Sequence, residues 1–197
     1  MQAVLARLVR REDLDEEAAA GLMRALTDAA LAPALAGAVL AALRSKGETA
    51  IEVRGFAAAM RALARAVPLP AGLSAVDVVG TGGDASGSLN LSTGAALLTA
   101  ACGLPVVKHG NRSVSSRSGS ADVLEALGIP TDLSPAVHEE RLLRHGLTFL
   151  FAPAHHPALR HAAPTRRELG VRTFFNLLGP LANPAFATHQ LVGLYDP

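Results

Sequence analysis

Residues 76–84 read Val76-Asp77-Val78-Val79-Gly80-Thr81-Gly82-Gly83-Asp84, an apolar run that leads directly into a glycine-rich loop. Branched apolar residues in a short run predict a buried strand, and the glycines predict a loop that exposes backbone N–H groups. Further elements are predicted downstream: strands at 105–108 and 147–151, and helices at 93–101, at 121–127 and from Ser134-Pro135 onward. This alternation predicts the α/β fold class with a mostly parallel sheet.

The chain before this strand has only helical periodicity. Apolar residues recur at three-to-four spacing through residues 1–66, and Thr49-Ala50-Ile51-Glu52 has the pattern of a capping box at a helix start. Pro68 and Pro70 then interrupt the pattern. We therefore predict a small N-terminal α-helical domain at residues 1–68 and a larger α/β domain at residues 69–197.

Composition narrows the class of protein. Half of the 197 residues are apolar, too many for a disordered chain, and a net charge of +1 favours neither nucleic acid nor an anionic surface as partner. No run of about 18 uncharged apolar residues occurs, so no membrane partner is expected. The single cysteine, Cys102, lies in an apolar stretch, and we expect it to be buried. These features predict a cytoplasmic protein.

Two polar loops carry the predicted chemistry. They cover residues 80–93 and 108–120, each directly after a predicted strand, where parallel α/β sheets bind their ligands. Asp and Glu are absent from residues 85–121, whereas Lys108, Arg112 and Arg117 fall inside this range. Glycine amides, a helix N-terminus and fixed cations together favour a phosphate group over the alternative of ordinary solvated loops.

Two common phosphate ligands fit the sequence less well. Residues 80–85 formally match a dinucleotide-binding glycine pattern, but the acid expected about 20 residues later is missing until Asp122. No Gly-Lys-Ser or Gly-Lys-Thr follows a glycine at the spacing of a nucleotide-binding P-loop. NAD and ATP are therefore disfavoured.

A third segment, residues 166–184, mixes apolar residues with Arg, Asn, Gly and Pro. This mixture suits an ordered loop around a flat, partly charged small molecule, because a planar guanidinium pairs bidentately with a carboxylate. A segment of helix caps and turns is the alternative interpretation.

Five motifs, in order along the chain, resemble the anthranilate phosphoribosyltransferase family: residues 80–84, 90–93, 108–112, 118–128 and 172–184. The resemblance extends over the whole chain. It implies transfer of the phosphoribosyl group from phosphoribosyl pyrophosphate (PRPP) to anthranilate in tryptophan biosynthesis, with Mg2+ as cofactor. It also implies a nucleoside phosphorylase/phosphoribosyltransferase-like fold and a homodimer formed mainly through the helical domain.

The resemblance further implies roles for individual residues. Those expected to bind PRPP are Gly80, Gly83, Asp84, Ser88, Asn90, Leu91, Ser92, Thr93, Lys108, His109, Gly110, Asn111, Arg112, Ser113, Val114, Ser115, Ser116 and Ser120. Those expected to bind anthranilate are Gly80, His109, Asn111, Arg166 and Gly179, with Arg166 on the carboxylate. Ser92 is expected to contact the magnesium. His109 is the candidate catalytic group, with a structural hydrogen-bonding role as the alternative, and no general base is assigned.

Two further pairs of residues are not expected to be catalytic. Adjacent histidines rarely chelate one metal ion, and no Cys or acid lies at ligand spacing from His155-His156, so these residues do not predict a metal site. Glu139-Glu140 is expected to lie on the solvated face of a helix.

The chain departs from the resembled family at its end. Members of that family are longer, and an Asp-Glu pair further along supplies much of their magnesium binding. This chain ends at Leu194-Tyr195-Asp196-Pro197, before such a pair. We therefore expect an α/β domain truncated at its C-terminus, and whether the 197 residues are active alone is left open.

Three alternatives come from other classes. A non-catalytic, nucleic-acid-binding or regulatory relative would be expected to lose one of the two polar loops. A pyrimidine nucleoside phosphorylase, which uses phosphate in place of PRPP, would have different residues at 108–120. An isolated helical assembly module is supported only by residues 1–66.

Overall fold

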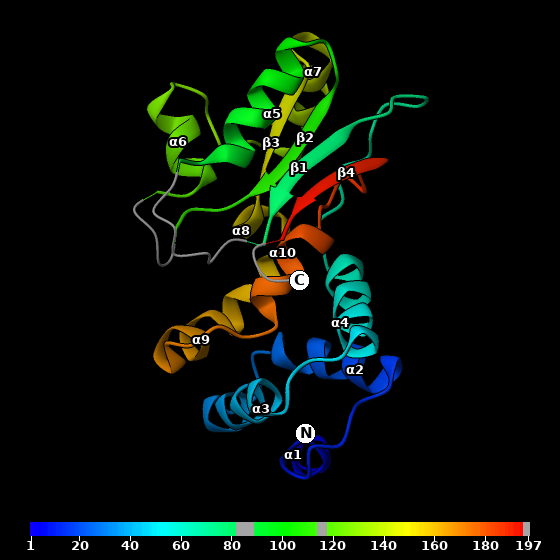
Figure 1. Ribbon diagram of the computed structural model, residues 1–197, viewed down its shortest axis with the longest axis vertical. Helices are drawn as coiled ribbons and strands as arrows, with labels where there is room; N and C mark the ends of the chain where they lie inside the picture. The colour runs from blue at the N-terminus through cyan, green and yellow to red at the C-terminus, as the bar shows by residue number, and fades with distance from the viewer. Residues whose placement is uncertain (82–88, 114–117, 195–197) are drawn as a thin grey trace. The chain divides into compact units, whose positions relative to one another are not determined.

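The computed structural model describes residues 1–81, 89–113 and 118–194. The chain divides into two compact units, and Figure 1 colours the chain by residue number from blue to red. The helical unit contains residues 1–64 and 156–182, and the sheet unit contains residues 65–155 and 183–197. Each unit is described by itself.

The helical unit is built from two stretches of chain. Its helices are α1 (Gln2–Val9), α2 (Glu16–Leu26), α3 (Pro33–Lys46), α4 (Ala50–Ala62), the 3-10 helix η1 (Pro157–His161), α9 (Ala163–Leu169) and α10 (Phe175–Leu181). One apolar core joins the two stretches, and in it the rings of Phe56 and Phe174 stack with centroids 4.1 Å apart. The boundary predicted at residue 68 assigned residues 156–182 to the α/β domain and not to the helical one. The structure differs because Phe174, Phe175 and Leu178 bury their side chains in the core of the N-terminal helices.

The capping box predicted at Thr49 is confirmed and belongs to a larger buried cluster. Glu52 is fully buried, and its carboxylate accepts hydrogen bonds from the backbone N–H groups of Leu14 and Thr49. The Lys46 ammonium lies 2.9 Å from the Glu52 carboxylate. Burial acts to raise the pKa of Glu52, but these hydrogen bonds and the Lys46 charge outweigh it, so the pKa is lowered. Glu52 therefore ties the start of α4 to the segment before α2.

The sheet unit contains the predicted parallel layer. Its elements are β1 (Val76–Gly80), α5 (Leu91–Ala101), β2 (Val106–Gly110), α6 (Ser120–Ala126), α7 (Pro135–His145), β3 (Leu147–Phe151), α8 (Ala152–His155) and β4 (His189–Gly193). All pairs are parallel, in the order β3-β2-β1-β4. Helix α5 packs against β1 and β2, and α7 packs against β3 (Figure 1).

The predicted elements of this unit are confirmed with small shifts of their ends. The strand at 147–151 has the predicted bounds, and α7 begins at Pro135 with Ser134 at its N-cap. The fourth strand, β4, was not predicted. All five of its residues are exposed, and this edge strand therefore lacks the alternating apolar pattern that reveals a half-buried strand.

Two expectations about the surface can be compared with the structure. Cys102 is exposed, so the prediction that it is buried was wrong. It lies at the C-cap of α5, where the chain turns at Gly103. Among the residues that the structure describes, no helix is both long and apolar enough to pass through a membrane.

Candidate functional site

The strand order places the candidate site at the ends of the central strands. Strands β1, β2 and β3 succeed one another in one direction, and β4 lies on the other side of β1. Ligands of such sheets bind beyond the carboxyl ends of the strands at this reversal. The first polar loop leaves β1 at Gly80, and the next backbone N–H, of Thr81, donates to Gly193 at the end of β4, 3.0 Å away.

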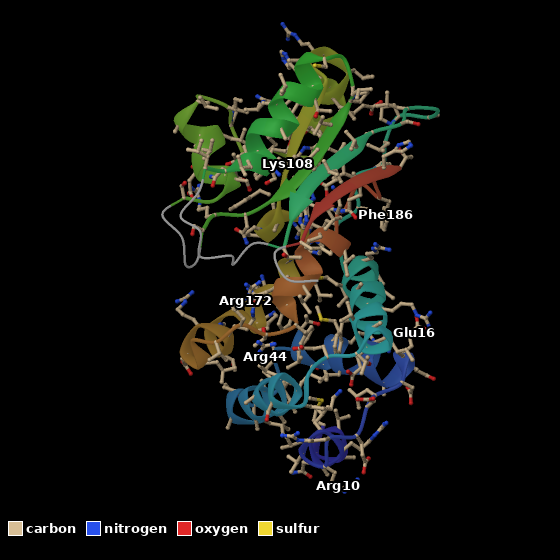
Figure 2. The ribbon with its side chains drawn as sticks, viewed as in Figure 1. Arg10, Glu16, Arg44, Lys108, Arg172 and Phe186 are labelled. Carbon is tan, nitrogen blue, oxygen red and sulfur yellow. The ribbon has the colours of Figure 1, made fainter. Side chains whose placement is uncertain are left out.

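Lys108, which was predicted to bind PRPP, lies inside the sheet unit (Figure 2). Its side chain is 2% exposed, and its ammonium donates to the carbonyl oxygen of Val78 at 2.7 Å. Burial lowers the pKa of Lys108 to about 8, and the negative charge of Asp77 opposes this shift. Lys108 therefore keeps most of its charge at neutral pH but has no exposed ammonium in this arrangement.

Asp77 is the buried acid beside Lys108. Its carboxylate accepts the backbone N–H of His109 at 3.3 Å and the side-chain amide of Gln190 at 3.2 Å. Burial raises the pKa of Asp77, against the lowering effect of hydrogen bonds from Asn183 and His109 and of the Lys108 charge. Sequence analysis did not single out Asp77 as a site residue. The signal that could have revealed it is an acid in the middle of an otherwise apolar strand.

The start of the second polar loop is held by close backbone packing. The Asn111 carbonyl oxygen accepts the Ser120 hydroxyl at 3.2 Å and the Ala121 backbone N–H at 3.2 Å. A Cβ atom on Gly119 would lie 2.6 Å from the Asn111 oxygen, and one on Gly110 would lie 2.1 Å from the Ser120 hydroxyl oxygen. Backbone atoms crowd Gly119, which therefore requires glycine, whereas side-chain atoms of Ser120 and Phe149 crowd Gly110.

Asn90 connects this loop with the N-terminus of α5. Its side-chain amide donates to the carbonyl oxygen of Gly119 at 3.1 Å and to the hydroxyl of Ser118 at 3.4 Å. The first turn of α5 follows directly with Leu91, Ser92 and Thr93. Asn90 therefore bonds to residues 118 and 119, directly before Ser120, whose hydroxyl bonds to Asn111.

Arg112 was expected to offer its positive charge to a phosphate, but its guanidinium is already paired with acidic side chains. Its guanidinium pairs with both carboxylate oxygens of Glu125, at 2.6 and 2.7 Å, and with Asp122 at 3.2 Å. These acids lie just beyond the acid-free stretch 85–121, and α6 brings them back to Arg112. Counting charges along the sequence thus overstated the positive charge of this loop. Ser113 is held nearby, since its backbone N–H donates to Asp122 at 3.2 Å.

Six of the predicted PRPP-binding residues lie outside the described residues: Gly83, Asp84, Ser88, Val114, Ser115 and Ser116. Arg117 of the predicted cationic tract also lies outside them.

The predicted carboxylate-binding residue, Arg166, belongs to the helical unit. Its guanidinium lies over the ring of Phe175, 4.6 Å from the centroid, and burial lowers its pKa. Among the described residues, no carboxylate pairs with it. Gly179 lies in α10 of the same unit, where a Cβ atom would meet nothing within 4 Å. The segment predicted as an ordered loop is thus partly helical, with Pro180 inside α10.

The rings of His155 and His156 each lie beside a backbone carbonyl oxygen. His155 Nδ1 lies 3.2 Å from the Arg65 carbonyl oxygen, and His156 Nε2 lies 3.0 Å from that of Ala182. In the described part of the chain, no three His, Cys, Asp or Glu side chains gather closely enough to hold a metal ion. Ser92 alone does not make a magnesium site, because Mg2+ requires several oxygen ligands.

Comparison with protein families matches almost the whole chain. Residues 2–64 match the helical bundle domain of a glycosyl transferase family, and residues 72–197 match the a/b domain of that family.

Three individual relatives are anthranilate phosphoribosyltransferases. The chain is 49% identical to an anthranilate phosphoribosyltransferase of Rhizobium meliloti over all 197 residues, which is 58% of that relative. It superposes on the Thermus thermophilus anthranilate phosphoribosyltransferase with a TM-score of 0.90 and 48% identity, covering 98% of this chain and 59% of that one. The Saccharomyces cerevisiae enzyme in complex with PRPP and Mg gives a TM-score of 0.80 at 28% identity, with 92% and 53% covered. The resemblance found in the sequence is therefore confirmed, and the chain spans less than two thirds of the length of these relatives.

Proposed function

This chain belongs to the glycosyl transferase family with a helical bundle domain and an a/b domain, and from that membership we propose that it transfers the phosphoribosyl group of PRPP to anthranilate. The products are phosphoribosyl-anthranilate and pyrophosphate, and the reaction is a step of tryptophan biosynthesis. The observation that carries this proposal is the 49% identity to an anthranilate phosphoribosyltransferase over the entire chain, both polar loops included. The activity belongs to a protein of the relatives' full length.

The proposed reaction requires neutralisation of the charge on pyrophosphate and alignment of the anthranilate amine with the ribose. The amine nitrogen of anthranilate forms a bond to the anomeric carbon of the ribose while the bond from that carbon to the pyrophosphate oxygen breaks, and the amine loses one proton. Negative charge grows on pyrophosphate, so donors and cations aimed at it lower the barrier. We assign this role to the N-terminus of α5 with Ser92, to the backbone of Gly80, and to the charge of Lys108, which acts from its buried position beside the Val78 carbonyl oxygen.

Mg2+ is the proposed cofactor, as the yeast relative was solved with PRPP and Mg. In proteins, Mg2+ is commonly bound by one or two carboxylates together with the phosphates of the substrate. Among the described residues no three His, Cys, Asp or Glu side chains gather around a possible ion, so we expect Mg2+ to bind at the Ser92 hydroxyl together with PRPP. Bound Mg2+ would neutralise phosphate charge.

The anthranilate side of the site is assigned to Arg166, Gly179, His109, Asn111 and Gly80. Arg166 carries a permanent charge that no described carboxylate neutralises, and the Phe175 ring holds its guanidinium in place. A carboxylate can accept two hydrogen bonds from such a group. Holding the substrate by its carboxylate would leave its amine free to be aligned with the ribose.

The first experiment is calorimetric titration of the purified chain with PRPP, with and without Mg2+, after circular dichroism has confirmed folding. We expect saturable binding that Mg2+ strengthens. Loss of anthranilate fluorescence in a protein of the relatives' full length then tests turnover. A folded protein of that length that neither binds PRPP nor consumes anthranilate would refute the proposal.

We also propose a homodimer formed through the helical unit and a cytoplasmic location. In such a dimer the partner would cover large apolar side chains that the helical unit exposes, among them Val9 (68% exposed) and Ile51 (53% exposed). Sedimentation equilibrium of the chain is the test, and a monomer at all concentrations would exclude the dimer.

A further inference from the structure

Strands β1 and β2 lie side by side but share a regular backbone ladder only at their beginning. They have one paired position, Val76 with Val106. In contrast, β1 pairs with β4 at five positions, and β2 pairs with β3 at five. Both β1 and β2 continue for four residues beyond their shared pair, so their last residues run side by side without a regular ladder.

Three side chains take the place of the missing ladder. The Val78 carbonyl oxygen accepts the Lys108 ammonium at 2.7 Å, and the Val107 carbonyl oxygen accepts the Asn183 amide at 2.8 Å. The His109 backbone N–H donates to the Asp77 carboxylate at 3.3 Å. Buried backbone groups of a sheet must find partners, and here side chains provide them. We call Asp77, Lys108 and Asn183 the strand-end cluster.

Stability alone gives little reason for this cluster. Asp77 and Lys108 are 0% and 2% exposed, and a buried ion pair is often no more stable than apolar residues of similar size. An ordinary backbone ladder would satisfy the same groups without burying charge. A role of these side chains at the strand ends explains the arrangement better, because the two polar loops begin where β1 and β2 end.

We propose that Asp77 is a positioning residue, which with Lys108 and Asn183 bridges the ends of β1 and β2 in place of a backbone ladder and thereby sets the place of His109 and Asn111. Asp77 does not touch substrate. It acts through the His109 backbone, two residues before Asn111, and through the ammonium that lies between the strands. The consequence for PRPP rests on the proposed function, whereas the bridging of the strand ends does not.

The test compares three variants with the unchanged chain. Asp77→Leu keeps the size of the side chain and removes its charge and its acceptors, while Asp77→Asn keeps one oxygen for the His109 N–H. Thr148→Val is the matched control, because Thr148 is equally buried in the same sheet but bonds to His138. The measurements are amide hydrogen exchange and chemical shifts by NMR, and PRPP affinity by calorimetry.

In Asp77→Leu we expect the His109 amide to exchange about ten- to a hundredfold faster and PRPP to bind about ten- to a hundredfold more weakly, the range for losing a hydrogen bond to a charged group. The amides of Leu40 and Leu43 in α3 of the helical unit should keep their shifts. Asp77→Asn should restore much of both properties, and Thr148→Val should change neither.

Several outcomes would overturn the proposal. Unchanged His109 exchange in Asp77→Leu is one, and equal effects of Thr148→Val are another. If Asp77→Leu does not fold, Asn183→Ala replaces it, because it removes an uncharged member of the cluster, and normal His109 exchange with normal PRPP affinity in that variant counts against the cluster. If the unchanged chain does not bind PRPP, the proposed function fails while the His109 exchange still decides the positioning role.

Discussion

At the scale of single residues, Arg166 offers the sharpest test of the anthranilate assignment. Its guanidinium is held over Phe175 and has no carboxylate partner among the described residues, so it is free to meet a substrate carboxylate. We expect Arg166→Ala to weaken anthranilate binding by about tenfold or more, as for a hydrogen bond to a charged group, and to leave PRPP binding nearly unchanged. Titration of anthranilate fluorescence in the presence of PRPP and Mg2+ measures the effect. Arg167→Ala, at the exposed neighbouring position, is the control, and equal losses of both ligands in Arg166→Ala would contradict the assignment.

Gly110 tests the close packing at the start of the second loop. A Cβ atom there would lie 2.1 Å from the Ser120 hydroxyl oxygen and 2.8 Å from the Phe149 ring. We expect Gly110→Ala to lower the free energy of unfolding by about 1–3 kcal/mol, the usual range for overpacking. Chemical denaturation measures it. In Gly94→Ala, where a Cβ meets nothing within 4 Å inside α5, stability should instead rise by about 0.5–1 kcal/mol. Unchanged stability in Gly110→Ala would show that small shifts of Ser120 and Phe149 relieve the crowding.

His138 makes the stability of the sheet unit depend on pH. The ring is 1% exposed, its Nδ1 lies 2.9 Å from the Thr148 hydroxyl, and burial together with His155 lowers its pKa from 6.5 to about 4. Between these pH values the unfolded chain binds more protons than the folded one, so stability is lost as the pH falls. We expect the free energy of unfolding to drop by up to about 3 kcal/mol between pH 6.5 and 4. Denaturation at several pH values should show a weaker dependence in His138→Asn than in His145→Asn, which alters an exposed ring of the same helix.

At the scale of elements, the sequence predicts what local patterns determine. The strand at residues 147–151 and the helix from Pro135 were recognisable because branched and aromatic runs, capping residues and proline act locally. Strand β4 was not, because an exposed edge strand is defined by its pairing with β1 and not by its own pattern. The pairing of Arg112 with Glu125 was missed for the same reason, since thirteen residues separate the two and only the packing of α6 brings them together.

The element that joins the N-terminal helices most directly is the start of α4. Glu52 is fully buried beside the Lys46 ammonium, and it also accepts two backbone N–H groups. Glu52→Gln leaves the Lys46 charge without this partner, so we expect a loss of about 3–5 kcal/mol, as for breaking a buried ion pair. Thermal unfolding by circular dichroism measures it. Glu17→Gln, in the exposed first turn of α2, should cost less than about 0.5 kcal/mol. The Asp13 carboxylate also lies 2.7 Å from the Lys46 ammonium. A similar cost for both variants would mean that Asp13 alone compensates the Lys46 charge.

At the scale of the whole molecule, the path of the chain contradicts a simple division into a helical beginning and a sheet. The helical unit recruits residues 156–182, and five of its buried core residues come from there: Ala162, Phe174, Phe175, Leu178 and Ala182. Sequence patterns before residue 68 could not predict this, because the N-terminal helices look complete by their own periodicity. The segment that carries Arg166 and Gly179 is thus anchored by the core of the N-terminal helices, which links the proposed anthranilate residues to that unit's stability.

This anchoring predicts that residues 1–64 do not form the helical unit alone. Without Phe174, the Phe56 ring loses the partner that stacks at 4.1 Å, and removing a buried phenylalanine typically costs about 3–5 kcal/mol. We expect the fragment 1–64 to lack a cooperative thermal transition in circular dichroism, and the same fragment to gain one when a peptide of residues 156–182 is added. In the full chain, Phe174→Ala should lower the melting temperature of the helical unit, whereas Leu177→Ala, at a position 36% exposed on the same helix segment, should change it far less. A fragment that melts cooperatively without the peptide would show that residues 156–182 only rest on a core that is complete without them.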